Sequence, residues 1–331
     1  MLGVSHTTVY LALRKDPRLP PATRDKVLRA AAEAGYWRDP VISELMARLR
    51  ASRKRSGRLP LGFVTAWPSR NGWREAVNHV RFFSGASARA SEIGYYLEEF
   101  WLAEEGMSSQ RLSAILRTRG IRGLILFSIP EPQGSVALDW RYFAAVTKGL
   151  TIVHPVMHRV ISSHYDDMLL ALSRIAESRC SRVGLALSKA ISDRVGGAWL
   201  AAYYLRQHDL PTENRLPVFF VPDANADSAF GRWMADNRPD VVVFAESIVV
   251  DCVTRLGIKV PRDLGLVHLN WSPDIARFAG IDSAPETLGA AAVDLLAGQL
   301  MANEFGVPLR EKVVEVRGRW VNGRTLPRRS V

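Results

Sequence analysis

The chain has 331 residues, of which 47% are apolar and 23% are charged, and its formal net charge is +11. This length allows two or three domains with cores of their own, and the composition is ordinary for a soluble protein. No apolar run is long enough to span a bilayer, and the N-terminus lacks the pattern of a secretion signal. Two isolated cysteines, Cys180 and Cys252, make neither a disulfide framework nor a CxxC metal pair. These features predict a cytoplasmic protein without membrane contact.

The positive charge is concentrated at the N-terminal end. Residues 1–58 hold 13 Lys/Arg and 5 Asp/Glu, a net charge of +8, whereas the remaining 273 residues hold 31 and 28, a net charge of +3. A basic head on a nearly neutral body indicates a polyanion-binding module joined to a separate domain. A merely solvated basic surface would explain the sign of the charge but not its confinement to one end.

The first element, "LGVSHTTVYLAL" at residues 2–13, predicts a turn followed by a short helix. Ser5 suits the N-cap, and Val9, Ala12 and Leu13 recur at helical spacing. Such a segment is typical of the second helix of a helix-turn-helix, which enters a DNA groove. The side chains expected to contact bases or phosphates are Ser5, His6, Thr7, Thr8, Tyr10, Leu11 and Arg14. The alternative for these residues is ordinary solvated helix surface.

Two more helices are expected in the head. "PATRDKVLRAAAEAGY" begins with Pro21 at a first helical position and ends with Gly35 as a C-terminal stop. "DPVISELMARLR" follows at residues 39–50. On this second helix Leu45 either wedges into a minor-groove base step or packs against a partner helix in a dimer, and the sequence leaves both open.

A basic linker, "ASRKRSGRLP", places a domain boundary near residues 57–60. Its run of Arg53, Lys54 and Arg55 is expected to attract phosphates without reading their sequence.

From Leu61 onward, short apolar runs alternate with amphipathic segments. Helical patterns are expected at residues 76–93, 109–119, 165–178, 197–208, 226–236 and 247–256. Strands with buried character between helices predict parallel sheets, and about eight strands favour two similar α/β lobes. Ligands of such folds bind at the carboxyl ends of the strands, here in the cleft between the lobes.

The head motifs "GVSHTTV" and "PPATRDKVLRAAAEAGY", with "DP" close behind, resemble the LacI/GalR family of bacterial transcription regulators. In the body, "SDRVGGAWLA", "VPRDLGLVHLN" and "AGIDSAPETLGAAAVDLL" resemble family motifs in the same order. The resemblance implies an α/β fold: a two-lobed periplasmic-binding-protein-like core, preceded by a small all-α helix-turn-helix headpiece with a hinge helix. The implied boundaries are a headpiece at 1–58 and a core at 59–331, with a first lobe at 60–154 plus 285–308 and a second at 155–284 plus 309–325.

Two departures from the family pattern bear on recognition. Tyr10 and Leu11 stand where the family usually has Ser-Arg, so a base-reading arginine is absent and the family's operator sequence does not carry over. Asn270 stands within the segment that replaces the family's Gly-Phe-Asp-Asp motif. An amide can still bond a hydroxyl as donor and as acceptor.

The residues expected to bind an effector follow strands or open helices, and they are Arg194, Asn270, Trp271, Glu246, Trp67 and Trp73. Arg194 precedes a glycine pair, and its forked donors could grip two hydroxyls or a carboxylate; the alternative is a surface ion pair. The tryptophans could stack on a sugar ring or fill the core, and Glu246 could instead be a solvated carboxylate.

The segment "HPVMHRVISSH" brings His154, His158 and His164 close together in sequence, at a spacing that metal ligands can have. No cysteine or paired carboxylate completes a metal set, so we expect neither a metal nor a cofactor. P-loop, GxSxG and HExxH motifs are absent, and an enzyme is not expected.

Together these features predict a ligand-responsive transcription regulator that binds a palindromic operator DNA as a homodimer. Of the two types of regulator, we expect a repressor. A small carbohydrate-like effector in the interlobe cleft would control it. The alternatives are a sugar-binding protein with a vestigial head and a carbohydrate enzyme on the same lobes.

Only Met1 and Leu2 precede the predicted turn, so the first helix of the helix-turn-helix is not in the sequence. We expect the coding frame to extend upstream by about ten residues, two to three helical turns. Translating the DNA upstream of Met1 checks this, because a stop codon directly upstream would contradict it.

Overall fold

The computed structural model describes residues 8–9, 12, 19–33 and 58–327. Its contacts divide the chain into two compact units, Met1–Gly57 and Arg58–Val331. In the first unit Thr8, Val9 and Ala12 are helical, and α2 spans Pro21–Glu33. All other predicted DNA-contacting residues lie outside the described residues, namely Ser5, His6, Thr7, Tyr10, Leu11, Arg14, Leu45, Arg53, Lys54 and Arg55.

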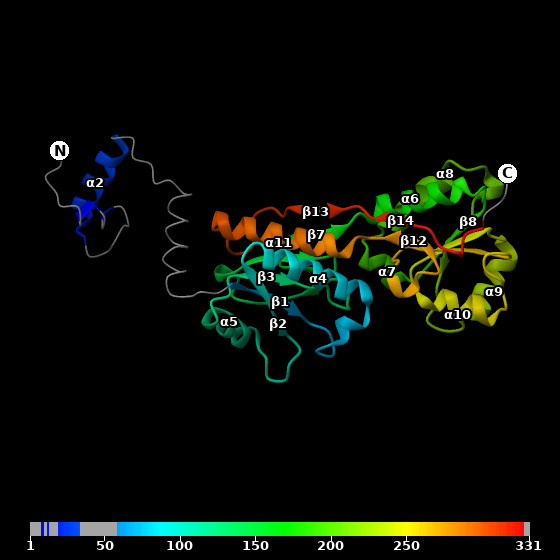
Figure 1. Ribbon diagram of the computed structural model, residues 1–331, viewed down its shortest axis with the longest axis horizontal. Helices are drawn as coiled ribbons and strands as arrows, with labels where there is room; N and C mark the ends of the chain where they lie inside the picture. Colours follow the sequence, from blue (N-terminus) through cyan, green and yellow to red (C-terminus); the bar gives the residue numbers. More distant parts are fainter. Residues whose placement is uncertain (1–7, 10–11, 13–18, 34–57, 328–331) are drawn as a thin grey trace. The chain divides into compact units, whose positions relative to one another are not determined.

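In the second unit, the described residues form two six-stranded sheets with helices on both faces (Figure 1). The first sheet has the order β13-β7-β5-β3-β1-β2, and all its neighbouring strands are parallel. Its strands are β1 (Leu59–Thr65), β2 (Tyr95–Trp101), β3 (Gly123–Leu126), β5 (Ala144–Lys148), β7 (His158–Ser162) and β13 (Val313–Val316).

Alternating side chains of this sheet build two cores. Leu61 and Phe63 of β1 pack with α4 (Val77–Glu92) and α11 (Pro285–Ala302), and Val64 packs with α5 (Ser109–Thr118) on the opposite face. This follows from the two-residue period of a strand, which sends successive side chains to opposite faces. The first sheet and these helices are called the first lobe below.

The second sheet has the order β14-β12-β11-β10-β8-β9, and only the β12–β14 pair is antiparallel. Its strands are β8 (Val183–Leu187), β9 (Phe219–Phe220), β10 (Val241–Phe244), β11 (Gly265–His268), β12 (Ala279–Asp282) and β14 (Arg319–Val321). The helices α6 (His164–Glu177) and α8 (Ala198–His208) pack on one face, and α9 (Ala226–Asn237) and α10 (Ser247–Arg255) on the other. With α7 (Lys189–Arg194) they form the second lobe.

Smaller elements complete the core. A parallel two-stranded sheet joins β4 (Gly134–Ser135) and β6 (Ile152–His154). Residues 58–327 also contain four short 3₁₀ helices, which are η1 (Gly72–Glu75), η2 (Trp140–Tyr142), η3 (Thr212–Asn214) and η4 (Pro273–Ile275). Among the helices that the structure describes, none is long and apolar enough to cross a membrane.

The lobe boundaries expected from the sequence need correction. The strand β7 pairs with β5 and β13 in the first sheet, so the chain leaves the first lobe after Ser162 rather than after residue 154. Residues 313–316 likewise belong to the first lobe, so the last crossing, from the first lobe to the second, lies between Val316 and Arg319 rather than after residue 308. Neither β7 nor β13 is a fully buried apolar run, so their sequences did not stand out as strands.

The helices α4 and α11 touch backbone to backbone through glycine. A Cβ atom added at Gly289 would lie 2.1 Å from the carbonyl oxygen of Phe82, so this crossing has no room for a side chain. We expect Gly289→Ala to lower the free energy of unfolding by about 1–3 kcal/mol, the usual cost of overpacking. Urea unfolding of the whole chain measures this.

Gly298, on the same helix, is the matched control. It is exposed, and a Cβ there meets nothing within 4 Å. Gly298→Ala is expected to stabilise the chain by roughly 0.5–1 kcal/mol, because glycine in a helix interior has excess freedom to lose. Equal effects of the two substitutions would contradict the close helix crossing.

Candidate functional site

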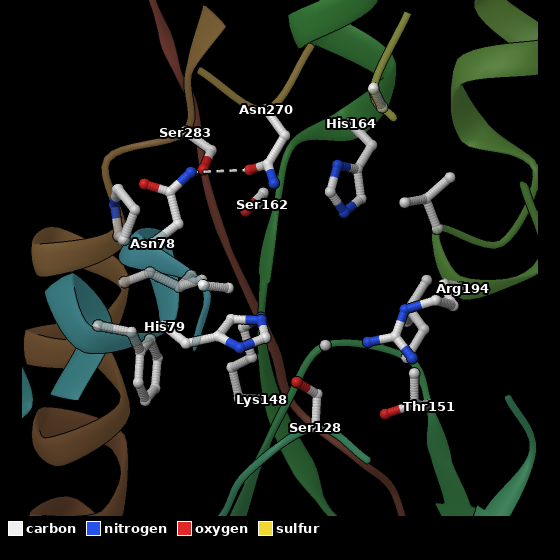
Figure 2. Close-up of a pocket in the computed structure, with 18 of the residues that line it drawn as sticks. Asn78, His79, Ser128, Lys148, Thr151, Ser162, His164, Arg194, Asn270 and Ser283 are labelled. Atoms are coloured by element: carbon white, nitrogen blue, oxygen red, sulfur yellow. Dashed lines mark hydrogen bonds between the residues drawn. The ribbon is translucent and has the colours of Figure 1, made fainter. Parts of the chain in front are cut away.

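A cavity of about 170 Å³ lies between the two lobes. Several of its walls are the carboxyl ends of strands: Lys148 ends β5, Ser162 ends β7 and Ser283 follows β12. This is where ligands of open parallel sheets bind. Its polar lining, labelled in Figure 2, consists of Asn78, His79, Ser128, Lys148, Thr151, Ser162, His164, Arg194, Asn270 and Ser283. The volume is below the ~300–1,000 Å³ of drug-sized sites, so it suits a small ligand.

Arg194 joins the two lobes at the cavity. It is the last residue of α7, a short helix capped by Ser188, whose hydroxyl accepts from the backbone N–H of Ile191 at 3.2 Å. The Nη1 of Arg194 donates to the carbonyl oxygen of Ile129 at 2.8 Å and also to that of Pro130, both in the first lobe. The guanidinium therefore contacts both lobes and the cavity.

A second cross-lobe contact involves Asn270, another predicted site residue. The Nδ2 of Asn78, on α4, donates to the Oδ1 of Asn270 at 2.9 Å and to the carbonyl oxygen of Trp271 at 3.0 Å (Figure 2). Trp271 thus contributes its backbone, while its side chain packs against the core of the second lobe. A ligand that meets Asn78 and Asn270 can therefore act on the angle between the lobes.

An ion pair beside the cavity, between Arg81 and Asp282, also links the lobes. Arg81 of α4 lies 3.0 Å from the carboxylate of Asp282 at the end of β12, and Arg319 of β14 lies 3.1 Å from it. Burial opposes ionisation of Asp282, but these two guanidinium groups lower its pKa below the usual value. Because Asp282 is only 1% exposed, its charge depends on both partners staying in place.

The titratable groups of the cavity are shifted toward their neutral forms. Burial lowers the pKa of His79 to about 3 and that of His164 to about 4, and the nearby Lys148 adds to both shifts. Burial, followed by the charge of Arg194, lowers the pKa of Lys148 to about 8. At pH 7 both histidines are therefore neutral, while Lys148 and Arg194 remain mostly charged.

Two buried polar atoms on the cavity wall have no hydrogen-bond partner in the described part of the chain: the Oγ of Ser128 and the Nε1 of Trp199. Their residues are 2% and 4% exposed. The indole of Trp199 stacks edge-on against His164, with ring centroids 5.1 Å apart. Unpartnered buried donors are costly, so these atoms favour a ligand that supplies acceptors.

The other predicted effector residues are not among those that line this cavity. Trp73 is 1% exposed within the aromatic core of the first lobe, and Trp67 donates its Nε1 to the carbonyl oxygen of Ser128 at 2.9 Å. The carboxylate of Glu246 accepts from the backbone N–H of Ser188 at 2.6 Å, which joins the ends of β10 and β8. Trp67 thus bonds a lining residue, whereas Glu246 bonds the N-cap residue of α7.

The histidine segment does not assemble a metal site. His158 accepts from the backbone N–H of Lys312 at 2.9 Å, His164 lines the cavity and His154 is exposed. No group of three or more potential metal ligands occurs within residues 58–327 or the described parts of the head.

Sequence reasoning did not single out Lys148, His79, Asn78 or Ser128. Lys148 could have been recognised from the apolar run "FAAVT" directly before it, because this run forms most of the buried strand β5 and Lys148 ends that strand. His79 and Asn78 lie in the first turn of α4, where only the lobe pairing brings them to the cavity.

A buried carboxyl lies near the crossing between the lobes. The side chain of Asp167, at the start of α6 and 2% exposed, accepts from the backbone N–H of Gly318 at 2.8 Å. Burial, with Asp166 and Glu315 adding to it, raises the pKa of Asp167 to about 7. The folded chain then holds this proton up to about pH 7, whereas the unfolded chain releases it near its ordinary pKa of 3.8. Stability is therefore lost as the pH rises between these values.

We expect Asp167→Asn to remove this loss. The amide oxygen can still accept from Gly318, so the variant should match the parent at pH 4 and be more stable at pH 8, by roughly 4 kcal/mol. Thermal unfolding at both pH values tests this. A constant difference at the two pH values would show that Asp167 does not titrate as described.

The chain is similar to known proteins in structure but not in sequence. No protein-family model matches the chain, and no curated protein matches it in sequence. Among solved structures, a transcriptional regulator CelR–cellobiose complex superposes with a TM-score of 0.58 at 17% identity, over 98% of this chain and 97% of that chain. A lac repressor dimer bound to operator and the anti-inducer ONPF gives 0.57 at 17% identity, over 98% and 96%.

A regulatory protein of the LacI family from Chloroflexus aggregans matches with a TM-score of 0.58 at 14% identity, over 81% of this chain and 99% of that chain. At identities of 14–17%, these similarities concern the fold. The core described here has the two-lobed α/β fold of the LacI-family transcription regulators.

Proposed function

We propose that this chain is a ligand-responsive transcription regulator rather than an enzyme, and that it acts as a repressor on a palindromic operator as a homodimer. The observation that carries the proposal is the cavity between the lobes, whose walls are joined across the gap by Arg194 and by the Asn78–Asn270 pair. A small sugar-like effector would bind there. Two copies of the basic head would bind the two half-sites of the operator.

Coupling between the effector and DNA needs a difference in affinity. A ligand shifts an equilibrium between two lobe arrangements only if it binds one of them more tightly. The cross-lobe bonds of Arg194 and Asn78 supply such a difference, because a ligand can replace or reinforce them in one arrangement and not in the other. The lobe angle would then set whether the two heads fit the operator.

Residues 1–58, the basic head, are the part of the chain that would bind DNA. Its net charge of +8 and its resemblance to LacI/GalR headpieces are both confined to residues 1–58. One solved structure of the same fold is a dimer bound to operator, and another holds cellobiose. We infer that this chain both binds an operator and binds a small ligand.

Binding to genomic DNA fragments tests the proposed function. The full chain is immobilised, fragments from its own genome are passed over it at moderate salt, and the retained DNA is sequenced. We expect enrichment of a few fragments that share an inverted repeat, and no such enrichment by a chain that lacks residues 1–58. Equal retention profiles for the two chains would favour a ligand-binding protein with a vestigial head.

A further inference from the structure

The lining of the interlobe cavity is cationic. Lys148 and Arg194 both line it, from opposite lobes, and none of its lining residues is an aspartate or glutamate. The negative charge of Glu131 raises the pKa of Arg194, but Glu131 is exposed and is not among the lining residues. Two positive charges without a carboxylate in the lining favour an anionic ligand over a neutral sugar, because a hydrogen bond between two charged groups is stronger than one to a hydroxyl.

Among the described residues, no carboxylate forms an ion pair with Lys148 or Arg194, and Glu131 acts on Arg194 only from outside the lining. Within the part of the chain that the structure describes, Arg194 donates to the two carbonyl oxygens already named, and the Nζ of Lys148 lies 5.2 Å from the ring centre of Phe127. Two like charges in a partly dry cavity raise each other's free energy, and an anion between them removes that cost.

The remaining polar groups also favour an acceptor-rich ligand. Trp199 Nε1 can only donate, and it has no partner in the described chain. The Nδ1 of His79 lies 3.0 Å from the carbonyl oxygen of Trp73, so that nitrogen carries the proton, and the ring adds no positive charge. The unpartnered hydroxyl of Ser128 can donate as well.

We propose that the ligand of this cavity is a small oxyanion, a carboxylate or phosphate ester on a short hydroxylated carbon skeleton, with its anionic group held between Lys148 and Arg194. Trp199 and Ser128 donate to the same ligand, and the amides of Asn78 and Asn270 meet its hydroxyl groups. This inference rests on the proposed function, because it takes the cavity to be the effector site.

Direct calorimetric titration of the full chain, without DNA, tests the inference. The probes are five- and six-carbon sugar acids and sugar phosphates, each beside its neutral parent sugar, at pH 7 and constant ionic strength. We expect at least one anion to bind tenfold or more tightly than its neutral parent. If that anion is a sugar acid, the anionic group of the ligand is a carboxylate; if it is a sugar phosphate, the group is a phosphate ester.

Two lysine variants separate the cavity from general surface charge. Lys148→Met should weaken binding of that anion at least tenfold, the scale of one charge-assisted hydrogen bond. Lys189→Met removes the same charge from a side chain that is 81% exposed and outside the cavity lining, so it should leave the affinity unchanged.

The proposal is overturned if neutral sugars bind as tightly as the anions, or if no anion binds the parent more tightly than it binds Lys148→Met. Circular dichroism of each variant shows whether it is folded. An anion that binds as expected, but leaves DNA retention unchanged, would count against the proposed regulator and not against the anion site.

Discussion

Replacing Arg194 with alanine is expected to abolish the ligand response while leaving the affinity for DNA nearly intact. The guanidinium lines the cavity and bonds the carbonyl oxygens of Ile129 and Pro130 across the lobes. Its removal takes away both a ligand contact and a cross-lobe contact, and the scale is about 1.5–3 kcal/mol of ligand binding for a charge-assisted hydrogen bond. Residues 1–58 are untouched, so DNA binding without ligand should persist.

Arg194→Lys is the informative companion variant. It keeps the positive charge but loses the planar fork of donors, so it can no longer bond two acceptors in one plane. We expect its ligand affinity to lie between those of the parent and Arg194→Ala. Ligand titrations that match the parent for both variants would remove Arg194 from the site.

Removing residues 1–58 is expected to remove nearly all binding to DNA of arbitrary sequence. The deleted segment carries +8 of the +11 net charge and leaves a body at +3. Binding to DNA phosphates releases counterions, so a chain that contacts six or more phosphates loses about 10³-fold or more in affinity between 50 and 200 mM salt. The truncated chain should bind weakly and with little salt dependence.

The measurement is the slope of log affinity against log salt for the two chains on one random duplex. The buried residues of the four core clusters lie within residues 61–296, so the truncation leaves them in place. A truncated body that kept the salt slope of the whole chain would show that the DNA-binding charge lies elsewhere.

Much of the fold was predictable because its strands and helices have clear periods. The helix expected at 109–119 is α5 at Ser109–Thr118, and the one expected at 226–236 is α9 at Ala226–Asn237. The apolar run "VVVFA" before Glu246 was predicted to be a strand, and it forms the buried strand β10. The lobe crossings were not predictable in the same way, since β7 and β13 are short and only partly buried.

The site was predictable only in part, for a physical reason. Arg194 and Asn270 sit at ends of secondary structure and carry strong polar groups, so their sequence context placed them at a cleft, and both line the cavity. Trp73 fills the core instead, because an aromatic side chain after a strand is equally suited to packing. Lys148 could not be recognised without β5, whose end brings it to the cavity.

Linkage between the ligand and DNA tests the central claim most directly. The affinity of the full chain for its retained DNA fragment is measured with and without saturating ligand, and the affinity for ligand is measured with and without that DNA. Thermodynamic reciprocity requires the same factor in both directions, and for an allosteric regulator we predict a factor of about 5–150. A factor of one in both measurements would contradict the account, because the cavity would then be occupied without any effect on DNA binding.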